Sequence, residues 1–230
     1  MKWHGTDRGR MRCIGHYGPM RLNLGSGQTA VPDWTNIDRS PNILLDRVPA
    51  VKRMLFRAGL LTEGHMQPWD REVIRQDIRK LPYPDNSVEA IYSSHTLEHL
   101  YLREAERVIG ECARVLQPGG LLRLALPDVE QFARQLLSGY VVGGQDAGRH
   151  FNSQLLAHPE ERPTLTGRLR SAVGGHVHRW QPSAPLVRQL MVDAGLLDVC
   201  DCAFRQGKLP GLDSIETREE SFFLEGRKMS

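Results

Sequence analysis

The order of apolar runs along the chain restricts the fold more than any other feature of the sequence. Short apolar runs that stop at glycine or polar residues alternate with longer segments in which apolar residues recur at helical spacing. Residues 88–92 and 121–126 are the clearest runs of the first kind. Repeated alternation of strand, loop and helix is typical of a parallel sheet with helices on both faces. The sequence therefore predicts an α/β fold with a doubly wound, mostly parallel sheet.

The individual elements follow from the same pattern. Strands are expected at residues 20–24, 34–38, 88–92, 121–126, 197–204 and 221–227, with a further short one just before Gln76. Helices are expected within 51–61 and over 97–116, 127–137 and 186–194, and a loop over 63–69. Gln117-Pro118-Gly119-Gly120 should end the second helix, because proline cannot continue it and glycine accepts the left-handed cap.

The length fits one domain with an insertion. A chain of 230 residues, 40% of them hydrophobic, can bury a full core. Residues 1–19 are polar and predict a flexible tail, so the domain should span 20–230. Residues 138–185 break the alternation with many Gly, His, Arg and Pro, and are too long for an ordinary connection. We expect them to form a lid-like insertion near the active site.

Charge, cysteine content and hydropathy limit the expected cellular location and binding partners of the protein. Lys and Arg number 30 against 27 Asp and Glu, a net charge of +3, and no basic stripe predicts nucleic-acid binding. Four cysteines form no C-x-x-C pair, which suits reduced thiols in a cytoplasmic protein. No apolar run reaches the ~18 residues of a membrane span, and no secretory signal is visible. A homodimer stays open.

Ligand-binding residues gather where the predicted strands end. In an open α/β sheet, ligands bind at the carboxyl ends of the strands, and Gly25, Gly27, Asp38 and Asp77 all arrive there. The glycines allow the backbone to approach a ligand, Asp38 can accept both hydroxyls of a ribose, and Asp77 can accept from an exocyclic amine. With Ile78 packed on a purine ring, these residues describe an adenosine site.

The same residues resemble the class I S-adenosylmethionine-dependent methyltransferases, and look most like a small bacterial branch associated with polysaccharide and secondary-metabolite modification. Five blocks carry the resemblance in the right order and spacing, from about residue 21 to 128 and more weakly over 178–227. They are Leu22-Asn23-Leu24-Gly25-Ser26-Gly27, Asn36-Ile37-Asp38, residues 76–92, residues 93–100 and residues 114–122. The resemblance implies a Rossmann-like, seven-stranded sheet whose last strand is antiparallel, with S-adenosyl-L-methionine as cofactor.

The resemblance also implies which residues meet the cofactor. They are Asn23, Gly25, Ser26, Gly27, Asp38, Asp77, Ile78, Ser94 and His95, with the glycines at the methionine moiety and Ser94 or His95 on the floor beside the sulfonium. Two departures stand out. Asn23 occupies a position that is acidic in many members, and only about ten residues separate Gly27 from Asp38. The helix after the first strand must therefore be very short or absent.

The acceptor is expected to be a small molecule or a glycan, methylated on a hydroxyl or, next in order, an amine. Removing the proton of an alcohol needs a base, and the candidates are His95 and then His178. His99, Arg179 and Trp180 are candidate acceptor-binding residues, since Arg179 could pair with an anion and Trp180 could stack on a ring. Packing roles explain each of these side chains equally well.

Residues 95–99 also spell H-x-x-E-H, the inverted zinc-protease motif. A zinc site of that type needs both histidines on one face of a helix. His95, however, directly follows a predicted strand, so His95 and His99 need not lie on the same helix face. A third ligand would have to be a downstream acid such as Glu160 or Glu161, which nothing singles out. We interpret the match as fortuitous, expect no metal, and take His99 as a structural histidine unless it meets the acceptor.

Two other classes of protein are compatible with parts of the pattern. A nicotinamide-dependent oxidoreductase also uses glycines and an acid after the second strand, but Ala30 stands where G-x-G-x-x-G needs its third glycine. A non-catalytic scaffold or binding subunit could keep the fold, and Asn23 with the shortened first helix raises that alternative. Fold alone does not decide between them.

Overall fold

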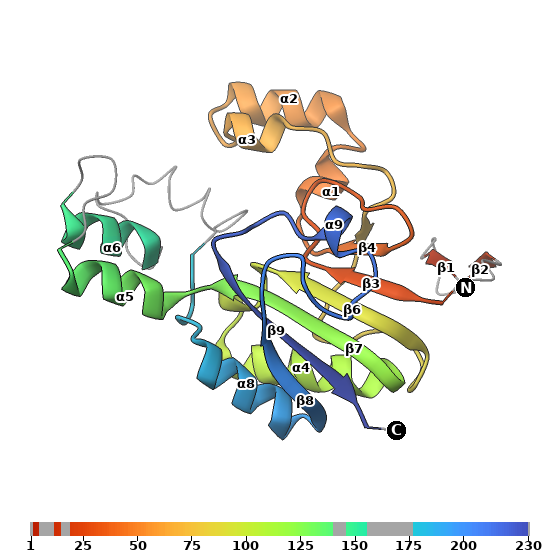
Figure 1. Cartoon of the computed structure of the whole chain (residues 1–230). Coiled ribbons are helices and arrows are strands. Elements are labelled where there is room, and N and C mark those ends of the chain that lie inside the picture. The colour runs from red at the N-terminus through yellow and green to blue at the C-terminus, as the bar shows by residue number, and fades with distance from the viewer. Residues whose placement is uncertain (1, 5–11, 15–18, 140–145, 156–176, 230) are drawn as a thin grey trace.

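A seven-stranded mixed sheet forms the centre of the protein in the computed structural model (Figure 1). The structure describes residues 2–4, 12–14, 19–139, 146–155 and 177–229. The strand order is β5-β4-β3-β6-β7-β9-β8, and all strands run parallel except β9, which is antiparallel to both β7 and β8. The predicted Rossmann-like α/β fold with an antiparallel last strand is confirmed. The strands are β3 Arg21–Leu24, β4 Thr35–Asp38, β5 Ile74–Arg75, β6 Val88–Ser94, β7 Leu116–Pro127, β8 Leu196–Cys202 and β9 Ser221–Lys228.

Helices follow most of the strands. They are α1 Asn42–Leu45, α2 Pro49–Arg57, α3 Glu63–Met66, the 3-10 turn η1 Leu97–His99, α4 Leu102–Val115, α5 Val129–Leu137, α6 Ala147–Leu155, α8 Ala184–Asp193 and α9 Leu212–Ile215. A separate antiparallel pair joins β1 Lys2–His4 to β2 Arg12–Ile14. The rest of the predicted tail, and residues 140–145 and 156–176 of the predicted insertion, lie outside the described residues.

The two faces of the sheet are covered differently. On one face, α4 and α8 pack over the larger core, which includes Leu24, Ile37, Ile91 and Leu124. On the other face, the connection from β8 to β9 with α9 buries a smaller cluster that includes Trp34. In Figure 1, α2 and α3 stand above the sheet, and α5 and α6 pack together beyond the end of β7. The carboxyl ends of the parallel strands lie between these two helix pairs.

The helix predicted over 97–116 is interrupted, which is a correction to the sequence analysis. It starts as the single turn η1, and the chain is extended at Leu100, with a ψ of 162°, before α4 begins. The reason is a competing segment. The Trp180 Nε1–H donates to the carbonyl of Leu97 at 2.9 Å, and the backbone N–H of Arg179 donates to the carbonyl of Glu98 at 2.7 Å. These carbonyls therefore bind another part of the chain instead of continuing the helix.

Residues 117–120 end α4 as predicted, but they belong to β7, so the strand expected from 121 starts earlier. Leu116 pairs with Val88, and an irregularity follows before Leu121 pairs with Ala90. Gly120 lies against its neighbours so closely that a Cβ would meet the carbonyl oxygens of Gln117 and Glu89 at 2.9 Å. The glycine allows the irregular strand to close on β6.

Short helices were missed in two predicted loops. The loop expected over 63–69 contains α3, where the side chains of Thr62 and His65 cap the first turn. The polar connection between β8 and β9 contains α9. Between β3 and β4 the described chain forms only turns, as the short spacing between Gly27 and Asp38 predicted. Among the described helices, none has the length and apolar character needed to cross a bilayer.

Candidate active site

The loop after β3 is the first part of the site. Gly25 and Gly27 both have left-handed backbones, with φ of 71° and 65°. The N–H groups of Gly25 and Ser26 donate to the Ile37 carbonyl at 2.8 and 3.1 Å, which holds the loop against β4. A Cβ on Gly25 would lie 1.8 Å from Thr96 Oγ1, whereas one on Gly27 would meet nothing within 4 Å. Gly25 thus lets β6 approach the loop, and Gly27 leaves room for a ligand.

Asp38 lies at the end of β4 beside this loop. Its Oδ2 accepts from the Gly27 N–H at 3.1 Å, and its Oδ1 accepts from the Ser40 N–H at 2.7 Å. Each carboxylate oxygen can accept more than one hydrogen bond, so both remain able to accept from a vicinal diol. Asp38 and the open backbone at Gly27 therefore fit the ribose and adjoining part of an adenosine cofactor.

Asn23 has a different surrounding from the one expected of a cofactor-binding residue. It is buried, and its Nδ2 donates to Asn36 Oδ1 at 3.0 Å, across the two strands where they pair. Asn36 in turn binds backbone groups of Val31 and Trp34. The amide of Asn23 thus fastens β3 to β4, and its contact with cofactor stays a prediction. Ser26 Oγ donates to the Gly27 carbonyl at 3.3 Å within the loop.

Asp77 and Ile78 follow β5. The Arg79 side chain donates to both carboxylate oxygens of Asp77, with the shortest bond, from Nη2 to Oδ2, at 2.6 Å. Hydrogen bonding to Arg79 holds the pKa of Asp77 down to about 2. Ile78 is buried in the larger core. The two residues reach the expected edge of the sheet, but adenine would share Asp77 with Arg79.

His95 directly follows β6, in a left-handed backbone conformation with φ of 47°. Its Nε2 lies 2.8 Å from Ser221 Oγ at the start of β9, and its Nδ1 lies 3.4 Å from Glu98 Oε1. Burial, and then the positive charge of Arg218, lower the pKa of His95 to about 4. The imidazole is therefore neutral at pH 7 and able to receive a proton. Ser94 is the last residue of β6, and its carbonyl accepts from Thr96 Oγ1 at 2.9 Å.

Glu98 is the buried acid of the cluster. Its side chain is 0% exposed, and neither carboxylate oxygen has a hydrogen-bond partner within the described chain. Burial raises the pKa of Glu98 to about 7. A carboxyl group in such surroundings is costly unless something compensates its charge.

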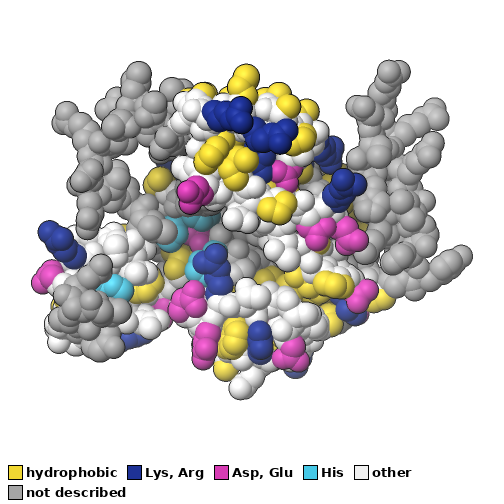
Figure 2. All heavy atoms as spheres, turned by 90° about the horizontal axis from the view of Figure 1, so that it is seen from above, with side chains coloured by type: hydrophobic (Ala, Val, Ile, Leu, Met, Phe, Trp, Pro, Cys, Tyr) yellow, Lys and Arg dark blue, Asp and Glu magenta, His cyan; other side chains and the backbone are white. Residues whose placement is uncertain are grey.

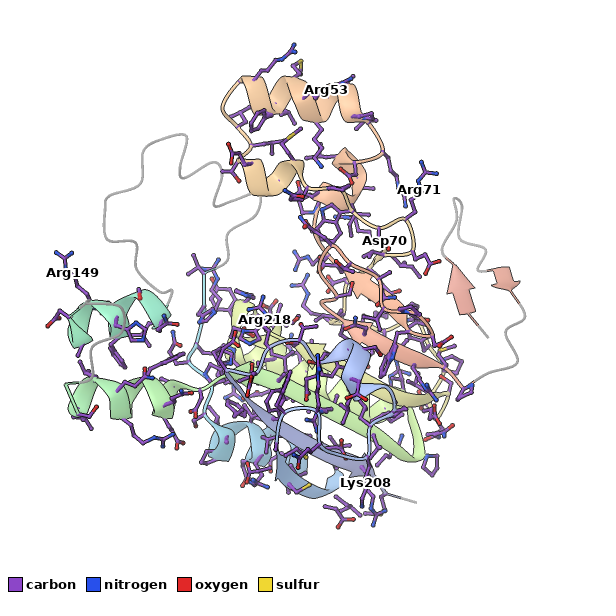
Figure 3. The ribbon with its side chains drawn as sticks, turned by 45° about the horizontal axis from the view of Figure 1, so that its top comes forward. Arg53, Asp70, Arg71, Arg149, Lys208 and Arg218 are labelled. Carbon is purple, nitrogen blue, oxygen red and sulfur yellow. The ribbon has the colours of Figure 1, made fainter. Side chains whose placement is uncertain are left out.

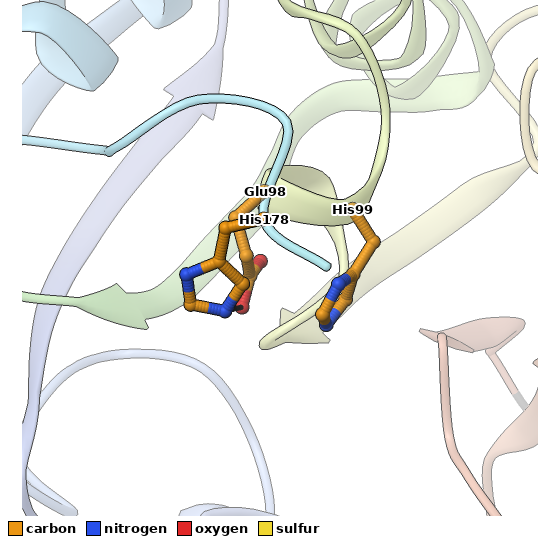
Figure 4. Close-up of side chains that lie close together, drawn as sticks. All are labelled: Glu98, His99 and His178. Carbon is orange, nitrogen blue, oxygen red and sulfur yellow. Dashed lines mark ion pairs between the residues drawn. The ribbon is translucent and has the colours of Figure 1, made fainter. Parts of the chain in front are cut away.

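His99 and His178 complete the cluster around Glu98, as the close-up shows (Figure 4). The His178 Nε2 is 4.0 Å from Glu98 Oε1, and the rings of His99 and His178 meet edge to face with centroids 5.1 Å apart. Burial lowers the pKa of His178. Seen from above, histidine side chains line a hollow near the middle of the molecule (Figure 2). The structure thus brings three of the predicted site residues, His95, His99 and His178, to one place.

Arg179 and Trp180 hold the segment with His178 against η1. Besides their bonds to the carbonyls of Glu98 and Leu97, the Arg179 guanidinium lies over the Tyr101 ring, 5.2 Å from its centroid. Trp180 packs partly on the larger core. Both side chains position His178, and their contact with an acceptor stays a prediction.

Sequence reasoning missed three residues of the site: Glu98, Ser221 and Arg218. Arg218 precedes β9 and is directed to the carboxyl edge of the sheet, unlike Arg53 and Arg149, which point outward (Figure 3). Glu98 had a signal, because it is the acid of the H-x-x-E-H match. The two histidines of that match do lie in different local structures, since His95 precedes η1 and His99 ends it. Glu160 and Glu161 lie outside the described residues.

Comparisons with known proteins agree with this geometry. Residues 23–124 match a family model described as a methyltransferase domain. A probable S-adenosylmethionine-dependent methyltransferase of Mycobacterium tuberculosis is 25% identical over 158 residues, which are 69% of this chain and 44% of that protein. A sterol 24-C-methyltransferase of Gibberella zeae is 35% identical over 65 residues, 28% of this chain and 17% of its own length. The chain spans less than half the length of these curated relatives.

The part of the chain from β3 to β7 is accordingly similar to a methyltransferase domain, and S-adenosylmethionine is the cofactor that this similarity indicates. A solved structure from Thermotoga maritima, described as a methyltransferase and possible histamine N-methyltransferase, is 19% identical, with 92% of this chain and 83% of that chain covered and a TM-score of 0.47. This likeness is too weak to bear on the acceptor.

Proposed function

We propose that the protein transfers the methyl group of S-adenosylmethionine to a hydroxyl, or an amine, of a small molecule or sugar. One observation carries the proposal: the open glycine loop and Asp38, which fit the cofactor, lie at the same sheet edge as a buried histidine cluster after β6. Thr96 joins the two parts, because it packs against Gly25 and follows His95. A cofactor site and a candidate base are therefore neighbours.

The residues have separable tasks in this reaction. The cofactor supplies a methyl group bonded to a sulfonium sulfur, and the remaining thioether is a good leaving group. Asp38 would hold the ribose hydroxyls, and the backbone at Gly27 would pass close to the cofactor, so that donor and acceptor are aligned. His95 would take the proton of an acceptor hydroxyl, which its neutral state permits. His178, also buried, is the second candidate for this role.

The proposal also covers the chemical class of the acceptor, the cellular location and the oligomeric state. We infer an acceptor that is a small molecule or glycan rather than a nucleic acid, because the net charge of +3 is small and no basic stripe marks the sequence. Arg179, Trp180 and His99 are the residues proposed to bind it. Reduced cysteines favour a cytoplasmic location, and a homodimer remains a testable alternative to a monomer.

Calorimetric titration with S-adenosylhomocysteine tests the cofactor assignment first. We expect micromolar binding that Asp38→Ala weakens at least tenfold, with no comparable binding of NAD⁺. Asp193→Ala is the matched control, since Asp193 is exposed at the end of α8 and contacts Gln189. Equal affinity of both variants would contradict the assigned role of Asp38.

Turnover is then measured with S-adenosylmethionine labelled in the methyl group and a panel of sugars, phenols and amines. His95→Asn should lower transfer to hydroxyl acceptors at least a hundredfold while S-adenosylhomocysteine binding changes little. Tight cofactor binding without transfer to any acceptor would instead favour the scaffold alternative.

A further inference from the structure

We propose that Glu98, His99 and His178 bind a divalent first-row transition-metal ion. The three side chains offer one carboxylate oxygen and two imidazole nitrogens, a donor set that suits Zn²⁺ and its neighbours in the series more than Mg²⁺ or Ca²⁺. Their ligand atoms all lie within 4.8 Å of one another. The proposal replaces the expectation, drawn from the sequence, that the H-x-x-E-H match is fortuitous and no metal binds.

The spacing of the donor atoms is close to what a metal ion needs. Zinc bonds to nitrogen and carboxylate oxygen are about 2.0–2.2 Å long, so two donor atoms on one tetrahedral ion are separated by roughly 3.4 Å. The donor atoms lie within 4.8 Å of one another, so they would have to close by up to roughly 1.4 Å around an ion. Rotation of the Glu98, His99 and His178 side chains is the movement that ion binding would require.

The state of Glu98 is an independent observation that points to a cation. Its carboxylate is fully buried, and neither oxygen has a hydrogen-bond partner in the described chain. A carboxylate left uncompensated in a protein interior is strongly unfavourable. A divalent ion between the carboxylate and the imidazoles would remove most of that cost.

The hydrogen bond of His99 suits a metal ligand. Its Nδ1 lies 3.2 Å from the carbonyl oxygen of Val177, which can only accept, so the proton belongs on Nδ1 and the lone pair on Nε2. Metal-binding histidines commonly donate their other ring N–H to a backbone carbonyl, which fixes the ring and its tautomer. Val177 precedes His178, so one segment supplies both a ligand and the group that orients another.

Backbone bonds hold the three ligands together before any ion arrives. Glu98 and His99 are consecutive in η1, and the segment with His178 is joined to that turn by Arg179 N–H and Trp180 Nε1–H. This arrangement explains why η1 ends after one turn. It also shows what the sequence motif contributes: two ligands from the end of H-x-x-E-H, with the third from His178 and not from a downstream acid.

His95 lies beside the proposed site and is not one of its ligands. Its Nδ1 is 3.4 Å from Glu98 Oε1, where it can orient the carboxylate, while its Nε2 contacts Ser221. If the proposed methyl transfer is correct, an ion at Glu98 would attract an acceptor hydroxyl and ease its loss of a proton to His95. That role rests on the proposed function, whereas metal binding does not.

The test uses the full chain, freed of metal with a chelator and carrying Cys200→Ser and Cys202→Ser, because these exposed or half-exposed thiols are competing zinc ligands. Zn²⁺ is titrated by calorimetry, and Co²⁺ is followed by its visible absorption. We expect one ion per chain, and Glu98→Gln or His178→Asn should weaken its binding at least a hundredfold. His150→Gln, a change of a histidine on α6, should leave binding unaltered.

Absence of stoichiometric binding, or equal affinity in Glu98→Gln and in His150→Gln, would overturn the proposal. Circular dichroism and S-adenosylhomocysteine titration of the same proteins show whether each variant is folded. If Glu98→Gln fails to fold, His99→Gln replaces it, since it leaves the buried acid in place. A chain that binds metal but not S-adenosylhomocysteine would refute the proposed function alone, and the reverse result would refute the metal site alone.

Discussion

Glu98 and Glu216 are both completely buried carboxylates, yet their surroundings are opposite. Glu216 forms two bonds to one guanidinium, from Arg123 Nε to Oε1 at 2.7 Å and from Nη2 to Oε2 at 2.9 Å, and also accepts from the Arg205 backbone N–H. Glu98 has three histidines around it and no hydrogen-bond partner in the part of the chain that the structure describes.

The difference separates a structural charge from a functional one. Arg123 also donates to the carbonyls of Ala203 and Gln206, so the Glu216 pair ties β7 to the connection that covers the second face of the sheet. The Glu216 carboxylate and the Arg123 guanidinium therefore satisfy each other's charge, and this pair is complete without a ligand. Glu98, by contrast, has no hydrogen-bond partner in the described chain. A ligand that supplied such a partner would therefore gain binding energy there.

The largest effect expected is the loss of stability in Glu216→Gln. Removing one partner of a buried ion pair should cost about 3–5 kcal/mol in the free energy of unfolding, since Arg123 then keeps only the more distant Glu225, whose Oε2 lies 3.5 Å from Nη1, as a charged partner. Glu98→Gln, measured in chelator, should not lower that free energy, because it breaks no ion pair and removes a buried carboxylate that has no partner in the described chain. Urea unfolding of both variants measures the two free energies. Equal losses in Glu216→Gln and Glu98→Gln would contradict the distinction between the two carboxylates.

The double variant Arg123→Met with Glu216→Leu sharpens this result. Replacing both members of a buried pair by apolar residues of similar volume is often neutral or stabilising. We expect the double variant to recover more than half of the stability lost in Glu216→Gln. Recovery of less would mean that the contacts of Arg123 with Ala203, Gln206 and Glu225 carry more of the stability than its pair with Glu216 does.

The next largest effect is expected at Gly25, where the backbone packs closely against Thr96. Gly25→Ala would place a Cβ within 1.8 Å of Thr96 Oγ1 at a φ of +71°, so we expect a loss of about 2–3 kcal/mol and weaker S-adenosylhomocysteine binding. Adding Thr96→Gly should restore part of the stability. Gly27→Ala, which meets no neighbouring atom, is the control and should cost about 1 kcal/mol from its backbone conformation alone.

Trp180→Phe tests how the segment with His178 is held. The indole N–H bond to the Leu97 carbonyl is lost while most of the ring packing remains, which should cost about 1 kcal/mol. Because the segment carries His178, binding of Co²⁺ should weaken as well, by about threefold or more. An unchanged affinity for Co²⁺ would show that Arg179 alone suffices to position it.

The smallest effect concerns a carboxylate at the surface. Asp77 has a folded pKa of about 2, below its usual value, so its pairing with Arg79 stabilises the protein above about pH 4 and loses that effect as the pH falls towards 2. Since both side chains are more than a third exposed to solvent, we expect less than about 1 kcal/mol. Urea unfolding between pH 2 and 5 should show a weaker pH dependence in Asp77→Asn than in the original chain.

Local patterns in the sequence were enough to predict the sheet and to place the candidate ligand-binding residues at one edge of it. Runs such as 20–24 and 88–92 end in glycine or serine at the correct places, and the short spacing from Gly27 to Asp38 correctly excluded a helix between β3 and β4. The predicted contacts of Asp38, Asp77 and the glycines with cofactor remain predictions. Their positions at the carboxyl edge agree with them.

Tertiary contacts account for what the sequence did not reveal. The interruption of the helix after His99 depends on Arg179 and Trp180, which are far along the chain, and the starting point of β7 depends on an irregularity opposite β6. The burial of Glu98 is equally invisible in the sequence, because acidic residues are usually exposed and the mixed polar and apolar residues around Glu98 do not indicate otherwise. The sequence argues against a metal site at the H-x-x-E-H match because His95 follows a strand and no third ligand stands out; only the fold brings His178 close to Glu98 and His99.

The place of β9 in the sheet has a consequence for how the chain is made. Residues 221–228 come late in the sequence, yet β9 lies between β7 and β8 (Figure 1). Until those residues leave the ribosome, the outer edge of β7 has no strand to pair with, and β8 cannot join the sheet. During that interval an apolar strand edge is open to other chains, which is the situation that leads to aggregation during synthesis.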